Sequence, residues 1–108
     1  MLFLSIDDFY EKVSSCSTLN RQEEIECAGQ MKKGDTSARE RLIQSYMSMV
    51  AGHIKRLQPH IQTLGLVIFC MQALEKAVDS FDFLQDSEPF SHRLSWYLRQ
   101  ATADYIVR

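Results

Sequence analysis

The sequence predicts an all-α protein, a compact bundle of four to five helices. Glycine and proline are scarce, with four and two among 108 residues, whereas β-sandwiches and barrels need many turn residues. Apolar residues recur at intervals of three and four, the period of a helix with one buried face. Apolar residues form 45% of the chain and charged residues 24%, which is typical of an ordinary globular domain.

The first two helices are marked by capping residues. Ser5, with an acidic residue three positions later, predicts a short helix over residues 6–14. Asn20, with a glutamate three positions later, predicts a second helix over residues 21–33. Gly34 is expected to end that second helix.

A longer third helix is predicted from Asp35 or Thr36 through Leu57, and its three-four rhythm of apolar residues ends before Pro59. The balance of charge also changes in this part of the chain. Residues 31–60 hold six basic and two acidic side chains, whereas the whole chain has a net charge of -2. Any contact with a polyanion is therefore expected to be local.

A fourth helix is predicted from Leu64 to Phe81, and its first half is apolar on every side. Such a helix either lies at the centre of a bundle or exposes part of its surface to a partner. We favour the exposed arrangement, because four or five helices rarely enclose one completely. The residues assigned to this partner-binding patch are Leu66, Val67, Ile68, Phe69 and Met71.

The last helix is predicted to begin near residues 89–90, with Ser87 as its N-cap. Trp96 falls about 150° from the centre of the apolar stripe of this helix. Either another segment covers this indole, or the indole forms an exposed face with Arg93 and Gln100. A flat ring for stacking, a guanidinium for phosphate and an amide for base edges favour single-stranded nucleic acid as the ligand of such a face.

Other kinds of site are not indicated. The three cysteines have no metal-ligand spacing, and no phosphate-binding loop, dinucleotide fingerprint or hydrolase motif occurs. We therefore expect no catalytic residue, no metal and no cofactor, and we predict that the protein is not an enzyme. The start of the chain lacks the pattern of a signal peptide, and no apolar run is long enough to span a membrane, so we expect a cytoplasmic protein.

Three segments, taken in order, resemble region 2 of the sigma-70 family, the bacterial RNA polymerase sigma factors. The family pattern is a Gly-Asp-x-x-Ala-x-x-x-Leu-Ile helix start, an Ala-Val-x-x-Phe-Asp helix end and a Phe-Ser…Trp-Trp-Ile-Arg-Gln-Ala promoter helix. The matching segments are KKGDTSARERLI at 32–43, LEKAVDSFD at 74–82, and FS at 90–91 with WYLRQA at 96–101. The resemblance implies a region 2-like helical domain over residues 19–108, preceded by a short helix and loop over residues 1–18.

This resemblance implies a module that acts in transcription initiation. It would bind the clamp helices in the largest subunit of the RNA polymerase core, and it would recognise and melt the promoter -10 element on its non-template strand. Trp96 and Tyr97 stand where the family has its tryptophan pair, and Gln100 stands where the family has the glutamine that reads the -10 element. Together with Arg93 from the exposed face, the implied DNA-binding residues are Phe90, Ser91, Arg93, Trp96, Tyr97, Arg99 and Gln100.

The family's core-binding stretch falls on residues 65–71, which read GLVIFCM and lack its polar and acidic contacts. This departure leaves an alternative open, a degenerate sigma-like interaction module that no longer reads promoters. Such a module would act as an auxiliary protein, or it would form a homodimer through the apolar patch.

Overall fold

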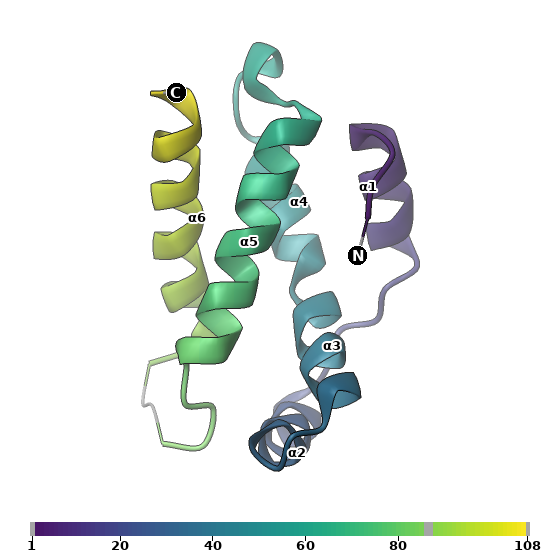
Figure 1. Cartoon of the computed structure of the whole chain (residues 1–108), viewed down its shortest axis with the longest axis vertical. Helices are drawn as coiled ribbons and strands as arrows, with labels where there is room; N and C mark the ends of the chain where they lie inside the picture. Colours follow the sequence, from purple (N-terminus) through teal and green to yellow (C-terminus); the bar gives the residue numbers. More distant parts are fainter. Residues whose placement is uncertain (1, 86–87, 108) are drawn as a thin grey trace.

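This computed structural model describes residues 2–85 and 88–107 of the chain (Figure 1). Over these residues the chain is helical and has no strand, so the predicted all-α bundle is confirmed. None of the helices in the described ranges has the length and apolar character needed to cross a membrane. In chain order the helices are α1 (Ile6–Ser14), α2 (Arg21–Lys32), α3 (Thr36–Ser45), α4 (Met47–Lys55), the short 3₁₀ helix η1 (Pro59–Ile61), α5 (Leu64–Ser80) and α6 (Phe90–Ile106).

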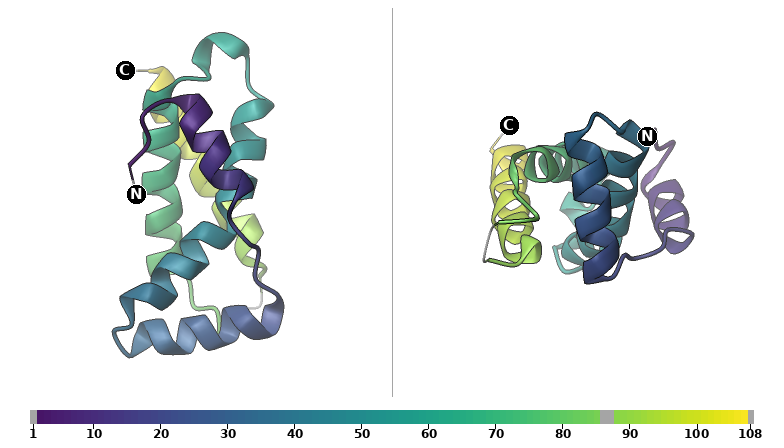
Figure 2. Two further views of the ribbon diagram at one scale, coloured as in Figure 1. Left: turned by 90° about the vertical axis from the view of Figure 1, so that its right-hand side faces the viewer. Right: turned by 90° about the horizontal axis from the view of Figure 1, so that it is seen from below.

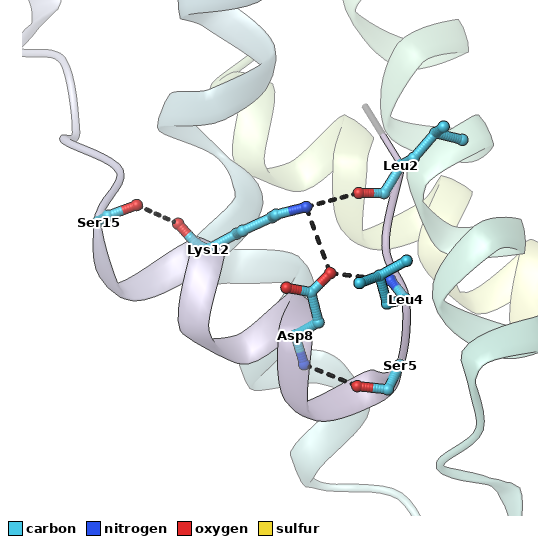
Figure 3. Close-up of polar contacts among 6 residues, drawn as sticks. All are labelled: Leu2, Leu4, Ser5, Asp8, Lys12 and Ser15. Carbon is cyan, nitrogen blue, oxygen red and sulfur yellow. Dashed lines mark hydrogen bonds and ion pairs between the residues drawn. The ribbon is translucent and has the colours of Figure 1, made fainter.

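Side chains satisfy the free backbone N–H groups at the starts of the first two helices, as the sequence predicts. Ser5 Oγ accepts a hydrogen bond from the Asp8 N–H at 3.1 Å (Figure 3). At α2 the Asn20 side chain accepts from the Glu23 N–H at 2.8 Å, and the Glu23 carboxylate accepts from the Asn20 N–H at 3.1 Å. This reciprocal pair fixes the start of α2.

Helix α6 begins at Phe90, in agreement with the predicted start near residues 89–90. Pro89 occupies the N-cap position, and no side chain makes a capping hydrogen bond there. Ser87, the predicted cap, lies outside the described residues. Proline suits this position for two reasons: its φ is fixed by the ring, and it has no N–H that would need a partner.

The segment between Asp35 and Leu57 was predicted as one continuous helix, and that prediction is wrong. Tyr46 separates α3 from α4, and its N–H bonds to the Ile43 carbonyl at 3.1 Å, which makes a tighter turn than an α-helix has. Both halves pack on α5, but their other neighbours differ: α3 also packs on α2, whereas α4 also packs on α1 (Figures 1 and 2). In Figure 2, α2 lies across one end of the bundle.

Helix α5 is the central helix of the bundle. It runs antiparallel to α6 (Figure 1) and also packs against α1, α3 and α4. Its buried residues lie on several sides of the helix, which explains why its first half is apolar all round. The partner-binding patch is therefore wrong for Leu66, Val67 and Met71, because these three side chains belong to the hydrophobic core.

The N-terminal helix shares this core. The Phe9 ring is fully buried among residues of the later helices, and it meets the Phe3 ring edge-on with centroids 5.1 Å apart. Lys12 fixes the position of the segment that precedes α1. Its ammonium donates to the Leu2 carbonyl at 2.7 Å and pairs with Asp8 at 3.3 Å (Figure 3).

Candidate nucleic-acid interface

The indole of Trp96 projects from the outer face of α6. It is 53% exposed, so neither a helix nor the N-terminal segment covers it. Arg99 and Gln100 are also exposed, and Arg93 is half-buried. The sequence left open whether this indole is covered, and the structure answers that it is accessible.

Tyr97 supports the indole from the side. The two rings meet edge-to-face, with centroids 5.5 Å apart and planes at 82°. The Tyr97 hydroxyl lies 3.2 Å from Ser80 Oγ at the end of α5, so the tyrosine is turned toward the bundle while the tryptophan is turned outward. The indole of Trp96 is therefore positioned by a partly buried neighbour, and its exposed surface is available for stacking.

Trp96 and Tyr97 together form a wall between two open hollows. The first, which we call the Arg93 hollow, has a volume of about 570 Å³ and is also lined by Glu88, His92, Arg93, Ser95 and Arg99. The second, the Lys76 hollow, lies between α5 and α6 and is also lined by Phe69, Gln72, Ala73, Lys76, Gln100, Ala101 and Asp104. Arg93 and Gln100 were predicted to act together, and the structure places them on opposite sides of the indole.

Arg93 is partly engaged within the protein. Its guanidinium carbon lies 5.7 Å from the centroid of the Phe81 ring, within the range of a cation–π contact. This contact orients the guanidinium at the rim of the Arg93 hollow, and no ion pair with a carboxylate competes for it among the residues that the structure describes.

Phe90 cannot contact DNA as the sequence implied. Its side chain is only 4% exposed and packs against the rings of Phe81, Phe83 and Tyr46, with centroids 5.1, 5.0 and 4.6 Å away. The assignment of Phe90 to DNA binding is therefore wrong, because the aromatic cluster at the start of α6 encloses the ring. Ser91 is half-buried next to it and lines a separate hollow.

A third hollow near this face was not identified from the sequence. It lies between α4 and α6, and we call it the Arg56 hollow; it is lined by Met49, His53, Arg56, Ser95, Leu98 and Arg99. His53 Nε2 lies 2.9 Å from Thr102 Oγ1, which joins the two helices. Burial, and then the nearby charges of Arg56 and Arg99, lower the pKa of His53. The basic residues at 55–56 were visible in the sequence, but their position beside α6 depends on the fold.

Within 2–85 and 88–107, no three His, Cys, Asp or Glu side chains gather in a way that could hold a metal ion. Cys27 and Cys70 are buried, and burial raises the pKa of the Cys70 thiol to about 11, so this thiol is not a reactive thiolate at neutral pH.

Comparison with curated proteins identifies a relative of this chain. The RNA polymerase sigma factor SigA of Clostridium acetobutylicum is 32% identical to it over an alignment of 109 positions. The alignment covers 96% of this chain. The chain is similar to one part of a sigma factor. It spans 29% of the length of that relative, and no family model matches the sequence.

The similarity reaches further toward the N-terminus than the three segments suggested. An alignment that covers 96% of 108 residues includes about 104 of them, so about four residues fall outside it. Most of residues 1–18 are therefore aligned with the sigma factor. This agrees with the structure, where Phe9 of α1 lies in the same hydrophobic core as the later helices.

Proposed function

We propose that this chain is a sigma-70-type region 2 module that acts in transcription initiation, binding the RNA polymerase core and the promoter -10 element. The similarity to SigA over almost the whole chain supports this function, as does the all-helical fold. The observation that carries the proposal is the exposed indole of Trp96 between two hollows, one of which is lined by both Arg93 and Arg99.

The geometry suits capture of unpaired bases. A base that leaves the duplex stacks on the free face of Trp96, and each such stack is worth roughly 1–3 kcal/mol. Arg93 and Arg99 at the Arg93 hollow neutralise backbone phosphate. Gln100, on the other side of the indole, offers an amide that can donate to and accept from a base edge. Trp96 would therefore stack on the base, while the Arg93 hollow binds phosphate on one side of the indole and Gln100 reads the base edge on the other.

Contact with the polymerase core is proposed at the exposed part of the α5 N-terminal half. Of the five patch residues, only Ile68 has a large exposed area, at 46%, while Phe69 is half-buried and packs against Tyr105. An exposed isoleucine next to a partly exposed aromatic ring gives a small apolar contact. This is the surface that remains of the predicted patch after the other three residues are assigned to the core.

The DNA role is tested with Trp96→Ala and a fluorescently labelled single-stranded oligonucleotide that carries a -10-like sequence. We expect the variant to bind about five- to 100-fold more weakly, because roughly 1–3 kcal/mol of stacking is lost and 1.4 kcal/mol corresponds to a factor of ten. The matched control is Ile106→Ala on the same helix, where the side chain is 56% exposed, and it should bind like the wild type. Equal affinities for Trp96→Ala and the wild type, with the fold intact, would refute base stacking at this position.

The polymerase role is tested with Ile68→Asp and purified core enzyme from a bacterium. We expect the substitution to reduce binding of the chain to core enzyme, because it places a charge in an apolar contact. The matched control is Leu84→Asp, which is equally exposed at 46% but lies in the connection after α5. Failure of the wild-type chain to bind core enzyme, together with self-association that Ile68→Asp abolishes, would instead favour the interaction module.

A further inference from the structure

The Arg56 hollow is lined by two cationic side chains, Arg56 and Arg99. Arg56 follows α4 directly, Arg99 lies on α6, and both side chains are exposed. Neither forms an ion pair among the residues that the structure describes, whereas Arg39 and Lys32 each pair with an aspartate. Among the residues that the structure places at this hollow, none is a carboxylate. Two arginines that converge on one open space without a counter-charge form an attractive site for an anion.

His53 is a titratable group beside the two arginines. It lies in the same hollow, and the charged groups that act on it are Arg56 from α4 and Arg99 from α6, while its contact on α6 is the neutral Thr102 hydroxyl. Both guanidiniums oppose protonation of the imidazole, in addition to the effect of burial. A bound anion would reverse the effect of the guanidiniums.

The hollow is continuous with the surface around Trp96. Ser95 and Arg99 line both the Arg56 hollow and the Arg93 hollow, so the two spaces share one rim on α6. A nucleic-acid strand with one base on the indole can therefore pass its backbone across Arg99 toward Arg56. This surface also draws on the part of the chain, residues 31–60, in which basic side chains outnumber acidic ones six to two.

We propose that Arg56, Arg99 and His53 form a phosphate site that holds the backbone of a single-stranded nucleic acid whose neighbouring base stacks on Trp96. The nucleic-acid identity of the ligand rests on the proposed function, whereas the anion site itself rests on the hollow. Arg56 and Arg99 supply the charge, and His53 donates a hydrogen bond when it is protonated.

The test compares Arg56→Gln with Lys55→Gln in binding of a labelled oligothymidylate over a range of salt concentrations. Each phosphate contact on a single strand contributes about 0.7 to the slope of log affinity against log salt. We expect Arg56→Gln to weaken binding at low salt and to reduce this slope by about 0.7. Lys55→Gln removes the same charge from the adjacent position, where the ammonium lies 4.7 Å from the Tyr10 ring, and it should leave the slope unchanged.

The second readout is the pKa of His53, measured by NMR titration of its ring protons. The oligothymidylate should raise this pKa in the wild type and in Lys55→Gln, and raise it much less in Arg56→Gln. If inorganic phosphate raises it as much as the oligonucleotide does, the hollow is a site for free phosphate and the assignment to a strand is wrong.

The two proposals fail in different ways. If Trp96→Ala weakens binding of the oligothymidylate but Arg56→Gln changes neither the slope nor the His53 response, the phosphate site is refuted and the stacking role stands. If the wild type does not bind the oligothymidylate and the pKa of His53 does not respond to it, the phosphate site is refuted, and the DNA role then depends on the separate result with the -10-like oligonucleotide. Urea unfolding of each variant establishes that the fold is intact.

Discussion

The Tyr46 hydroxyl donates a hydrogen bond to the Glu24 carboxylate and thereby ties the bend between α3 and α4 to α2. The ring of the same tyrosine packs edge-on against Phe90 at the start of α6, with centroids 4.6 Å apart. Tyr46 therefore joins the bend between α3 and α4 to α2 and to the start of α6. The bend orients α4, and with it the side of the Arg56 hollow that α4 provides.

Tyr46→Phe should lower the free energy of unfolding by about 1.5–3 kcal/mol, the usual contribution of a hydrogen bond to a charged partner. The substitution keeps the ring and its contact with Phe90, so the loss measures the hydroxyl alone. Urea unfolding followed by circular dichroism gives the value. Glu24→Gln retains an acceptor for the hydroxyl and should cost less than Tyr46→Phe; an equal or larger cost would mean that the carboxylate stabilises the fold in another way.

The stability of the wild type should also depend on Tyr46 at alkaline pH. Burial, and then the bond to Glu24, raise the pKa of Tyr46 above its ordinary value of 10.0. Above pH 10 the unfolded chain loses this proton while the folded protein retains it. The stabilisation is therefore complete below pH 10 and decreases as the pH rises further. In urea titrations at several pH values, Tyr46→Phe should lose less stability than the wild type between pH 10 and 11.

The sequence predicted those features whose causes lie within a few residues of one another. The start of α2 needs only Asn20 and Glu23, which are three positions apart, and its prediction is confirmed. The bend at Tyr46 depends on Glu24 and Phe90, which are far away in the chain, so a regular apolar rhythm hid it.

In the candidate site, too, the sequence predicted only those features that depend on residues close together in the chain. Periodicity placed Trp96 opposite the core, and the exposed indole agrees with that placement. For α5 the pattern allowed two arrangements, because an apolar surface looks the same whether neighbouring helices or a partner cover it. The pairing of Arg56 with Arg99 requires α4 and α6 to lie together, which no local signal encodes.

Acid should weaken the link between α3 and α5. Arg39 Nε and Nη2 donate to the two carboxylate oxygens of Asp79 at 2.7 and 2.9 Å, and this holds the pKa of Asp79 below its ordinary value of 3.8. A group with a lowered pKa stabilises the fold above its unfolded value and loses that effect as the pH falls through its folded value. Because solvent screens the pair, Asp79→Asn should cost less than about 1 kcal/mol at neutral pH.

The difference in stability between the wild type and Asp79→Asn should therefore be constant above pH 5 and should shrink below pH 4, as measured by urea unfolding. The matched control is Asp104→Asn on α6, an exposed carboxylate without an ion pair among the described residues. A difference that stays constant down to pH 2 would show that the Arg39 contact does not favour the ionised form of Asp79.

Gly65 near the start of α5 leaves room for the Tyr105 ring. A Cβ at this position would lie 3.0 Å from Tyr105 Cε1 and Oη, and Tyr105 is held by a 2.6 Å hydrogen bond with Thr63. We expect Gly65→Ala to lower the melting temperature even though alanine favours helix formation. Gly29→Ala in the middle of α2 meets no atom within 4 Å and should raise the melting temperature, because glycine costs about 0.5–1 kcal/mol in a helix. A rise in both variants would show that Tyr105 moves aside freely.

Phe90 and Trp96 lie six positions apart on α6, and their alanine variants should affect different properties. Phe90→Ala empties a buried site and should cost about 3–5 kcal/mol of unfolding free energy. Trp96→Ala removes a side chain that is half in solvent, so its effect on unfolding should be much smaller. The effects on DNA binding should be the opposite. Trp96→Ala should bind DNA weakly at every temperature. Phe90→Leu keeps most of the buried volume and should bind DNA like the wild type wherever it is folded. Weak binding by folded Phe90→Leu, measured by anisotropy well below its melting temperature, would return Phe90 to the list of residues on which DNA binding depends.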